Sequence, residues 1–236
     1  MSNTSINKKI SGFLLIDKPE GISSFGAVYK VRKVLKELTG EKYKVGHSGT
    51  LDPAATGLLI LAIGKSTKEL HKLLKQDKTY DVEMYLGKNS STEDKEGELV
   101  EVSDIIPAKN EVIESINKFY GDILQTPPIY SAIKVNGHRA YKLARKGEQL
   151  KMEPRPAKII SISEIKYKYP SVYFTCEVSS GTYIRSLVRD IGEKLGTGAY
   201  MSNLRRTAIS KYSINEATKV EDISTKSIEN VLINLE

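Results

Sequence analysis

Apolar residues recur along this chain at two different spacings, and the two kinds of pattern are interspersed rather than grouped. Residues 12–17 and 58–63 are short apolar runs, which are typical of buried strands. Residues 184–195 carry an apolar stripe at helical spacing that Gly196 closes. Because strands and helices are mixed without a strict strand–helix–strand rhythm, the sequence predicts an α+β fold built on a mixed sheet.

The remaining patterns add further elements. Ser24 is the predicted N-cap of a helix that ends before Gly40, and the capping-box pattern at 66–69 predicts a second helix through Leu74. Alternating side chains predict a strand over 80–86 with one solvated face. Four further predictions are a polar loop at 87–97, a helix at 112–119, a hairpin of strands 160–169 and 172–178, and a short terminal helix within 221–236.

Composition excludes several classes of protein. A single cysteine, Cys176, rules out an intramolecular disulfide framework. The first ten residues lack the apolar core of a signal peptide, and no stretch approaches the ~20 apolar residues of a membrane span, so we expect a cytoplasmic protein. The three histidines are scattered and lack cysteine partners, so we expect no metal site. Gly64-Lys65-Ser66 is not a phosphate loop, because that loop needs a glycine where Leu59 stands.

The positive charge is concentrated in one segment. The chain has a net charge of +7, and residues 134–158 alone contain eight Lys or Arg against two Glu. A solvated, lysine-rich surface loop is one interpretation. We favour contact with a polyanion, because aromatic and apolar residues are interleaved with the cations and would order the segment.

Residues 46–57 surround one carboxylate, Asp52, with three glycines, a proline and three hydroxyl side chains. Glycine permits close backbone approach to a ligand, and a proline after Asp52 favours an extended backbone that limits where the carboxylate points. One interpretation is a reactive carboxylate. The other is that Asp52 caps a turn, as Asp-Pro often does. The spacing alone leaves both open.

This segment, Gly46-His47-Ser48-Gly49-Thr50-Leu51-Asp52-Pro53-Ala54-Ala55-Thr56-Gly57, resembles the signature of the bacterial tRNA pseudouridine(55) synthases (TruB type). The resemblance implies a pseudouridine-synthase fold with a mostly antiparallel central sheet flanked by helices. It continues in family order through Leu15-Ile16-Asp17-Lys18-Pro19, Lys78-Thr79-Tyr80, Gln125-x-Pro127-Pro128, Gly181-Thr182-Tyr183-Ile184-Arg185 and Leu204-Arg205-Arg206.

The resemblance implies an isomerase that uses neither metal nor cofactor. In that family the aspartate matching Asp52 attacks the target uridine, either at the sugar or at the base ring, and the base detaches, rotates and rejoins through carbon. Burial alone would neutralise such a carboxylate, so a cation must offset it. Arg185 resembles the family arginine that pairs with the aspartate. By position alone Arg185 would be a surface residue, since it lies off the apolar helix stripe.

Other matched residues would line the substrate pocket. Tyr80 matches the family tyrosine that stacks on the target base and takes part in proton abstraction, and its alternative is an inward-facing strand residue. His47 matches the histidine that packs against the flipped-out nucleotide, although a lone histidine is usually structural. Four more residues resemble the floor or lining of the pocket, with ordinary packing or a solvated charge as the alternative: Lys18, Pro19, Tyr183 and Leu204.

Residues 133–155 resemble an insertion that closes over RNA in this family. A uridine inside a folded T-loop must be extruded before it can react, so recognition reads the shape of the loop and stacks splayed bases. We expect contacts with tRNA phosphates from four cations of the insertion: Arg139, Lys142, Arg145 and Lys146.

Two features depart from the family pattern. Bacterial members usually carry a further C-terminal RNA-binding domain of the PUA type. Here we expect a single catalytic domain over 1–236, with its core at about 12–212 and no PUA domain. In the loop after the Tyr80 strand, Ser91 replaces the first of two usual acids. Asp94 retains the second and resembles the acid that holds Arg185; a solvated loop charge is the alternative.

The sequence therefore predicts a monomeric enzyme that isomerises uridine to pseudouridine at position 55, in the T-loop of tRNA, with Asp52 as the nucleophile. A guide-RNA-dependent pseudouridine synthase is one alternative, although the insertion at 132–141 favours the stand-alone type. A non-catalytic protein that binds and remodels tRNA is the other alternative.

Overall fold

The computed structural model describes residues 9–135 and 137–234, which form two compact units. Unit 1 contains the residues up to Gln76 and from Arg206 onward, and unit 2 contains residues 77–205. The boundary falls inside one strand, β12 (Ala199–Ile209), which contributes to both units. Unit 1 is therefore discontinuous in sequence, whereas unit 2 is one continuous stretch.

Unit 1 is built around a pair of apolar strands. Strands β1 (Gly12–Lys18) and β3 (Thr56–Ile63) pair antiparallel along their length, from Gly12 opposite Ile63 to Lys18 opposite Gly57. The strand order is β14–β1–β3–β12, in which β14 runs parallel to β1. Three short strands belong to this unit: β2 (Val45–His47) beside β3, β13 (Tyr212–Ser213) beside β12, and β14 (Thr218–Lys219).

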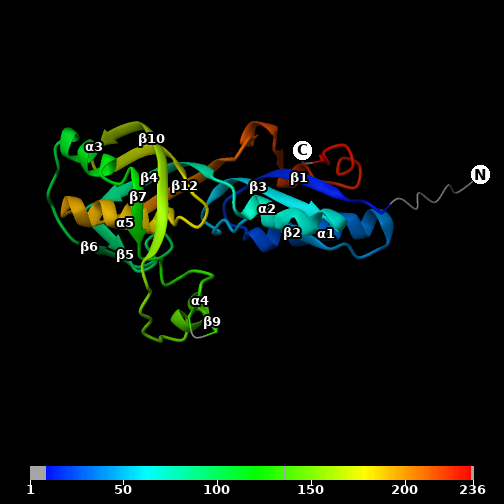
Figure 1. Ribbon diagram of the computed structural model, residues 1–236, viewed down its shortest axis with the longest axis horizontal. Coiled ribbons are helices and arrows are strands. Elements are labelled where there is room, and N and C mark those ends of the chain that lie inside the picture. Colours follow the sequence, from blue (N-terminus) through cyan, green and yellow to red (C-terminus); the bar gives the residue numbers. More distant parts are fainter. Residues whose placement is uncertain (1–8, 136, 235–236) are drawn as a thin grey trace, which may run out of the picture. The chain divides into compact units, whose positions relative to one another are not determined.

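Both faces of β1 and β3 are buried, as their continuous apolar sequences require. On one face, alternate residues of the two strands pack with Leu73 of helix α2 (Leu70–Leu74). Helix α1 (Ser24–Thr39) buries one side and exposes the other, and Figure 1 shows α1 and α2 running alongside these strands. The second face is formed by the strand residues of opposite parity, all fully buried: Leu14, Ile16, Leu59, Leu61 and Ile63.

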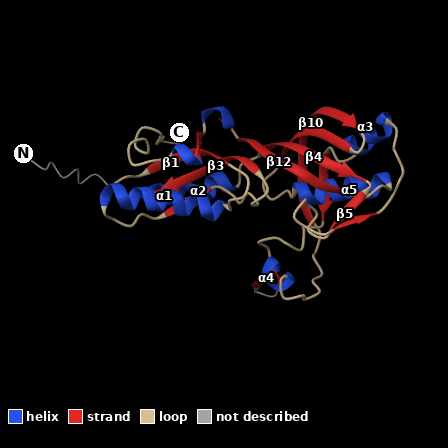
Figure 2. Cartoon of the chain, turned by 180° about the vertical axis from the view of Figure 1, so that it is seen from behind, coloured by secondary structure: helices blue, strands red, loops and turns tan. Residues whose placement is uncertain are grey.

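Unit 2 contains a sheet in the order β12–β4–β11–β10–β7, in which β4, β11, β10 and β7 pair antiparallel with their neighbours among these four strands. Helices α3 (Lys109–Asn117) and α5 (Ile184–Leu195) pack on each other, α3 also against β10 and α5 also against β4. The colouring in Figure 2 separates these helices from the strands. The strands are β4 (Lys78–Leu86), β7 (Gly121–Gln125), β10 (Arg155–Lys168) and β11 (Ser171–Val178).

Two small hairpins supplement unit 2. Strands β5 (Lys88–Ser90) and β6 (Leu99–Glu101) form one of them. The other consists of β8 (Lys134–Val135) and β9 (His138–Arg139), and helix α4 (Ala140–Ala144) follows it directly. Figure 1 shows β9 and α4 outside the strands of the unit 2 sheet, so the basic insertion is a substructure of its own.

The predicted α+β fold with a mixed, mostly antiparallel sheet is confirmed. The strands at 12–17, 58–63 and 80–86 are present, as are the hairpin of β10 and β11 and the helix that Gly196 ends in the left-handed conformation. The single-domain boundaries stay a prediction. Within the described residues, no helix is both long enough and apolar enough to cross a membrane.

Several local predictions are wrong, each because a distant contact takes over. Ser23, not Ser24, caps α1, since the Ser24 hydroxyl bonds to Leu51. Residues 66–69 do not form a capping box, because the Ser66 amide and hydroxyl bond to Ser11; a 3₁₀ helix, Gly64–Glu69, precedes α2. The polar loop at 87–97 begins with strand β5.

The predicted terminal helix is also wrong over the described residues. One 3₁₀ turn, Val220–Asp222, is followed by turns, and Ile233 then forms an isolated β-bridge with Phe13. Pairing with β1 satisfies the backbone there in place of a helix. Leu235, Asn136 and residues 1–8, on which other sequence expectations rest, lie outside the described residues.

Candidate active site

Asp52 lies in unit 1, on a loop between β2 and β3 whose backbone is held on both sides of the carboxylate. Before it, the Ser24 hydroxyl accepts from the Leu51 amide at 2.8 Å and donates to the Leu51 carbonyl at 2.9 Å. After it, the carbonyl of Pro53 accepts from the amide of Gly21 at 2.9 Å. The Asp52 carbonyl itself accepts from the Ala55 amide at 3.1 Å, which closes a turn. The loop is thus fixed by contacts with distant residues.

Lys18 is fully buried at the end of β1. Its ammonium donates to the carbonyls of Pro19 and Ile22, each at 2.8 Å, and to that of Pro53 at 3.3 Å. A buried ammonium is tolerated only when such partners replace its water. Lys18 therefore links the segment 19–22 to Pro53, the residue that follows Asp52. Lys18 is thus neither a solvated charge nor an ordinary packing residue, the two alternatives that its sequence position allowed.

Arg206, at the start of the unit 1 portion of β12, is also buried, although the sequence pattern indicated no role for it. Its guanidinium donates to the Leu58 carbonyl at 2.7 Å and to the Gly49 carbonyl at 3.2 Å. The backbone of Arg206 also passes so close to Gly57 that a Cβ there would overlap it. Together, Lys18, Ser24 and Arg206 form what we call the loop clamp.

His47 lies at the end of β2, directly before this loop, and is partly buried. Burial, followed by the positive charge of Arg206, lowers the pKa of His47 from its usual 6.5. The Gly49 amide donates to the Nδ1 atom of His47 at 3.3 Å, so the neutral ring carries its proton on Nε2. A neutral, oriented imidazole presents a flat face rather than a charge.

Arg185, in the first turn of α5, is buried in unit 2 although it lies off the apolar stripe. Its guanidinium donates to the carbonyls of Thr92 at 3.1 Å and Tyr130 at 2.9 Å. The same group pairs with the buried carboxylate of Asp94 at 3.5 Å. The structure thus brings Arg185 and Asp94 together, and neither is the solvated surface charge that position alone suggested.

A second ion pair, which the sequence patterns did not predict, adjoins this one. Glu93, which precedes Asp94 with a positive φ of 64°, pairs with Arg189 and accepts from the Ser186 hydroxyl at 3.1 Å. Burial raises the pKa of the Glu93 carboxyl, and the Arg189 charge partly offsets that rise. Helical spacing places Arg189 one turn after Arg185, which was the available signal.

The other predicted site residues of unit 2 occupy three elements. Tyr80 is buried on β4, on the same side as Val82 and Met84, and Leu204 is buried on β12. Tyr183, the N-cap residue of α5, has its amide and carbonyl bound by the Gln125 side chain at 2.8 and 3.0 Å. These two hydrogen bonds hold the backbone of Tyr183 in place, two residues before Arg185.

The four cations of the insertion are exposed: Arg139, Lys142, Arg145 and Lys146. Arg145 lies over the ring of Tyr141, 5.7 Å from its centroid, and Arg139 reaches the Ala132 carbonyl at 3.5 Å. Backbone bonds from Ala140 to Ile133 and from Tyr141 to Ser131 close the base of this segment. The insertion is folded, and its charges face solvent.

The predicted residues therefore form two groups. Unit 1 holds Lys18, Pro19, His47 and Asp52, and unit 2 holds Tyr80, Asp94, Tyr183, Arg185 and Leu204. The pairing of Asp52 with Arg185 stays a prediction. Among the described residues, no three His, Cys, Asp or Glu side chains gather as a metal site.

Solved structures share this fold. A chain of the Cbf5-Nop10-Gar1 complex aligns with a TM-score of 0.67 at 31% identity, covering 89% of this chain and 53% of that one. A chain of an H/ACA RNP bound to a substrate RNA containing 2'-deoxyuridine aligns with a TM-score of 0.64 at 29% identity, over 89% of this chain and 51% of that one. This chain spans about half the length of these solved chains.

Sequence comparison is more specific. Residues 32–184 match the TruB family pseudouridylate synthase N-terminal domain, and residues 185–232 match the tRNA pseudouridylate synthase B C-terminal domain. The tRNA pseudouridine synthase B of Clostridium acetobutylicum is 43% identical over 96% of this chain and 77% of its own length. That of Pseudomonas fluorescens is 40% identical over 95% of this chain and 72% of its own length. This chain belongs to the TruB family of pseudouridylate synthases.

Proposed function

We propose that this chain converts uridine to pseudouridine in the T-loop of tRNA, at position 55, with Asp52 as the nucleophile. The observation that carries the proposal is the loop clamp. It fixes the backbone on both sides of Asp52, within a sequence 43% identical to a tRNA pseudouridine synthase B. A nucleophile held in advance avoids the entropic cost of ordering it during the reaction.

The reaction is an isomerisation, so its atoms balance within the substrate. The bond from the sugar to N1 of uracil breaks, the base rotates, and a new bond forms from the sugar to C5. C5 loses a proton and N1 gains one. The protein must supply a nucleophile, a surface that keeps the detached base in place, and a group that moves the C5 proton.

Three residues of unit 2 fit the remaining roles. Tyr80 offers a buried ring on a rigid strand, which suits stacking on the base and moving its proton. Arg185 supplies a buried cation to keep a carboxylate ionised, and Asp94 holds its guanidinium. His47 of unit 1, neutral and oriented, offers a flat face to the extruded nucleotide.

The pocket itself would be completed by residues already described. Lys18 belongs to the loop clamp and donates to the carbonyl of Pro19. Tyr183 is the N-cap residue of α5, and Leu204 lies on β12. We propose that all four shape the space for the nucleotide without taking part in bond making.

The exposed cations of the insertion support contact with tRNA phosphates. The affinity for tRNA falls as salt rises, and each phosphate contact makes this fall steeper. Removing four such contacts should reduce the magnitude of the slope of log K against log salt by about 3. Neutralising Arg139, Lys142, Arg145 and Lys146 to Gln should therefore flatten the salt dependence of tRNA binding. An unchanged slope would count against this part of the proposal.

The central experiment uses unmodified tRNA and the purified chain, with no guide RNA. Pseudouridine should appear at position 55, and Asp52→Asn should lower the rate by about 10³-fold or more while tRNA binding persists. Asp104→Asn, at an exposed loop carboxylate, is the matched control and should retain activity. Product at another position would remove the T-loop assignment.

The same experiment separates the alternatives. A guide-RNA-dependent enzyme would give no product until a guide RNA is added, and a tRNA-remodelling protein would give none in either case. We propose further that the chain acts on the T-arm as a monomer in the cytoplasm. Sedimentation of the chain with and without tRNA checks the monomer, and a two-to-one complex would contradict it.

A further inference from the structure

The solvent-facing side of α1 combines aromatic rings with cations. Phe25 and Tyr29 are 62% and 64% exposed, which is unusual for large aromatic side chains on a helix that has a buried face available. Arg32 lies over the Phe25 ring, 5.7 Å from its centroid. We call the following residues the α1 surface: Phe25, Tyr29, Arg32, Lys33, Lys36, Lys42 and Tyr43.

The spacing of the residues of this surface that belong to α1 places them on one side of the helix. Phe25, Tyr29, Lys33 and Lys36 follow one another at intervals of three or four, which aligns side chains along a helix. The opposite side is the one that unit 1 buries, with Ala27, Val28, Val31, Val34 and Leu35. The folding of unit 1 therefore leaves the aromatic and basic side free.

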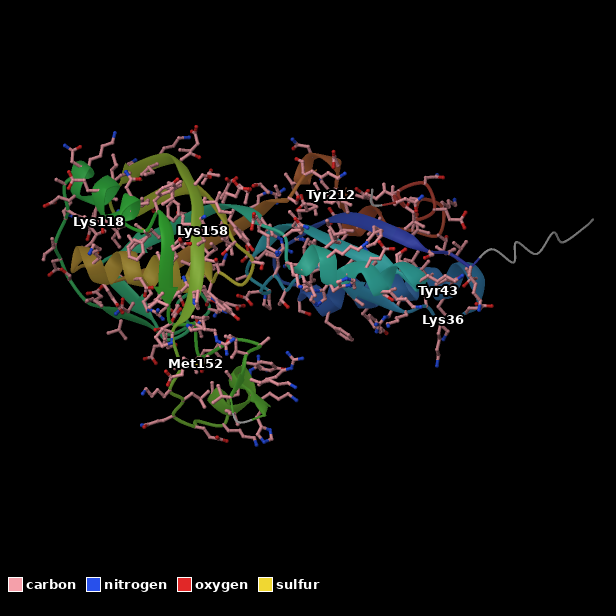
Figure 3. The ribbon with its side chains drawn as sticks, in the orientation of Figure 1. Lys36, Tyr43, Lys118, Met152, Lys158 and Tyr212 are labelled. Atoms are coloured by element: carbon pink, nitrogen blue, oxygen red, sulfur yellow. The ribbon has the colours of Figure 1, made fainter. Side chains whose placement is uncertain are left out.

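The C-terminal half of this surface is hollowed. A depression of about 670 Å³ lies between the helix and the residues that follow it, and Figure 3 shows Lys36 and Tyr43 close together there. Its lining comprises two tyrosines, four cations and one carboxylate: Tyr29, Tyr43, Arg32, Lys33, Lys36, Lys42 and Glu37.

Two walls of the hollow are fixed by contacts outside it. The Tyr43 hydroxyl accepts from the Ile10 amide at 3.3 Å, and the Arg32 guanidinium donates to the Val45 carbonyl at 2.7 Å. The single carboxylate, Glu37, lies 3.9 Å from Lys33 in an exposed pair, and such pairs contribute little. The hollow therefore has one fixed aromatic wall, one fixed cation and an excess of positive charge.

We propose that the α1 surface binds the sugar–phosphate backbone of the substrate tRNA and stacks one unpaired base on Tyr29. Cations interleaved with exposed rings are the combination that holds unpaired nucleic acid, because lysines contact phosphates while rings stack on bases. An acidic peptide would pair with the cations of this surface, but it would not account for the exposure of the Phe25 and Tyr29 rings.

The position of this surface within unit 1 supports an RNA occupant. Phe25 directly follows Ser24, whose hydroxyl binds the backbone of Leu51 beside Asp52. An RNA that presents a uridine to Asp52 therefore needs only to continue along α1 to reach the hollow. This inference rests on the proposed function, since it names a second contact for the same substrate.

The test compares tRNA binding by the parent chain and by a variant with Tyr29→Ala, Lys33→Gln and Lys36→Gln. These side chains are on the solvent side of α1, so the variant and the parent chain should have the same thermal unfolding temperature. We expect tRNA affinity to fall about tenfold or more, and the slope of log K against log salt to drop by roughly 1.5 for two lost phosphate contacts. Tyr29→Phe, which keeps the ring, should bind as the parent does.

The matched control removes an equally exposed tyrosine and two lysines from α3 of unit 2 and the residues directly after it. Tyr120 is 66% exposed, and Lys118, labelled in Figure 3, lies two residues before it in sequence. The variant Tyr120→Ala, Lys109→Gln, Lys118→Gln has the same change in charge and ring count, and it should bind tRNA with unchanged affinity and slope. If both variants bound tRNA with equally reduced affinity, the proposal would be overturned, because the loss of affinity would then follow from the change in net charge alone.

Failure of this inference can be told apart from failure of the proposed function. If the parent makes pseudouridine and the α1 variant binds tRNA with unchanged affinity and slope, the inference fails, the function stands, and the surface is left to a protein partner. If the parent binds tRNA through the α1 surface but makes no pseudouridine, the proposed function fails while the inference stands.

Discussion

The loop that carries Asp52 and the basic insertion both contain glycines, yet they are stabilised in opposite ways. The loop is held by two buried cations, Lys18 and Arg206, which donate hydrogen bonds to backbone carbonyls. The insertion exposes its cations and is closed mainly by local backbone bonds. A positive charge can thus serve as internal scaffolding or as a contact for a ligand, and burial decides which.

The largest effect should come from adding a side chain to Gly57, near the start of β3 and directly after the Asp52 loop. Gly57 has a φ of 105°, and an added Cβ would overlap the Arg206 backbone, so Gly57→Ala should destabilise the chain by about 5 kcal/mol or prevent folding. Gly147 of the insertion has a φ of 77° but open space around it, so Gly147→Ala should cost only about 1–2 kcal/mol. Urea unfolding checks both, and equal costs would contradict the comparison.

The next effect should come from removing a buried cation. Lys18→Met removes the donor that three backbone carbonyls share and should lower the free energy of unfolding by about 3 kcal/mol. Pseudouridine formation should fall as well, because Pro53 is no longer tied to β1. Lys142→Met, at an exposed cation of the insertion, should leave stability unchanged. A loss of stability in Lys142→Met would show that the insertion is also scaffolding.

A smaller effect concerns pH. The pKa of His47 is lowered in the folded chain, so its neutral form contributes stability that is fully present above pH 6.5 and is lost as the pH falls through the folded pKa. His47→Gln should remove this part of the acid sensitivity in unfolding measurements between about pH 7.5 and about pH 5. His138→Gln, an exposed insertion residue, should keep the parent profile. Identical profiles for both variants would exclude His47 as the source.

The smallest effect on stability should come from the insertion charges. Replacing Arg139, Lys142, Arg145 and Lys146 by Gln should change the free energy of unfolding by less than about 0.5 kcal/mol, because exposed charges far from buried contacts contribute little. Thermal unfolding in parallel with tRNA binding would then show a binding defect without a folding defect. A clear drop in stability would mean that the cation over Tyr141 matters to the fold.

Sequence patterns predicted the features that depend on neighbours along the chain. The strands at 12–17 and 58–63, the helix ended by Gly196 and the alternation around Tyr80 all follow from local periodicity. The family resemblance supplied Asp52, His47, Arg185 and Asp94, of which the last two are in contact.

The features that were missed depend on residues far apart in sequence. Ser24 looks like a cap, but its hydroxyl bonds to Leu51, 27 residues away. Arg206 bonds to the Leu58 carbonyl across 148 residues. Arg185 is buried because the Thr92 carbonyl and the Asp94 carboxylate pair with its guanidinium. The periodicity of the helix gives no sign of these partners, since they lie on a distant loop. Local patterns indicate which face of an element is apolar, but not which polar group will be covered by a distant segment.

The discontinuity of unit 1 has a consequence for the order in which the chain can fold on the ribosome. Residues 77–205 of unit 2 are contiguous and emerge before Arg206, whereas the Asp52 loop needs donors and strand partners from 206 onward. The nascent chain can therefore complete unit 2 first. The loop that carries Asp52 can reach its final form only after Arg206 and the residues that follow it have been made, so a translation product truncated before Arg206 would lack an organised Asp52 loop.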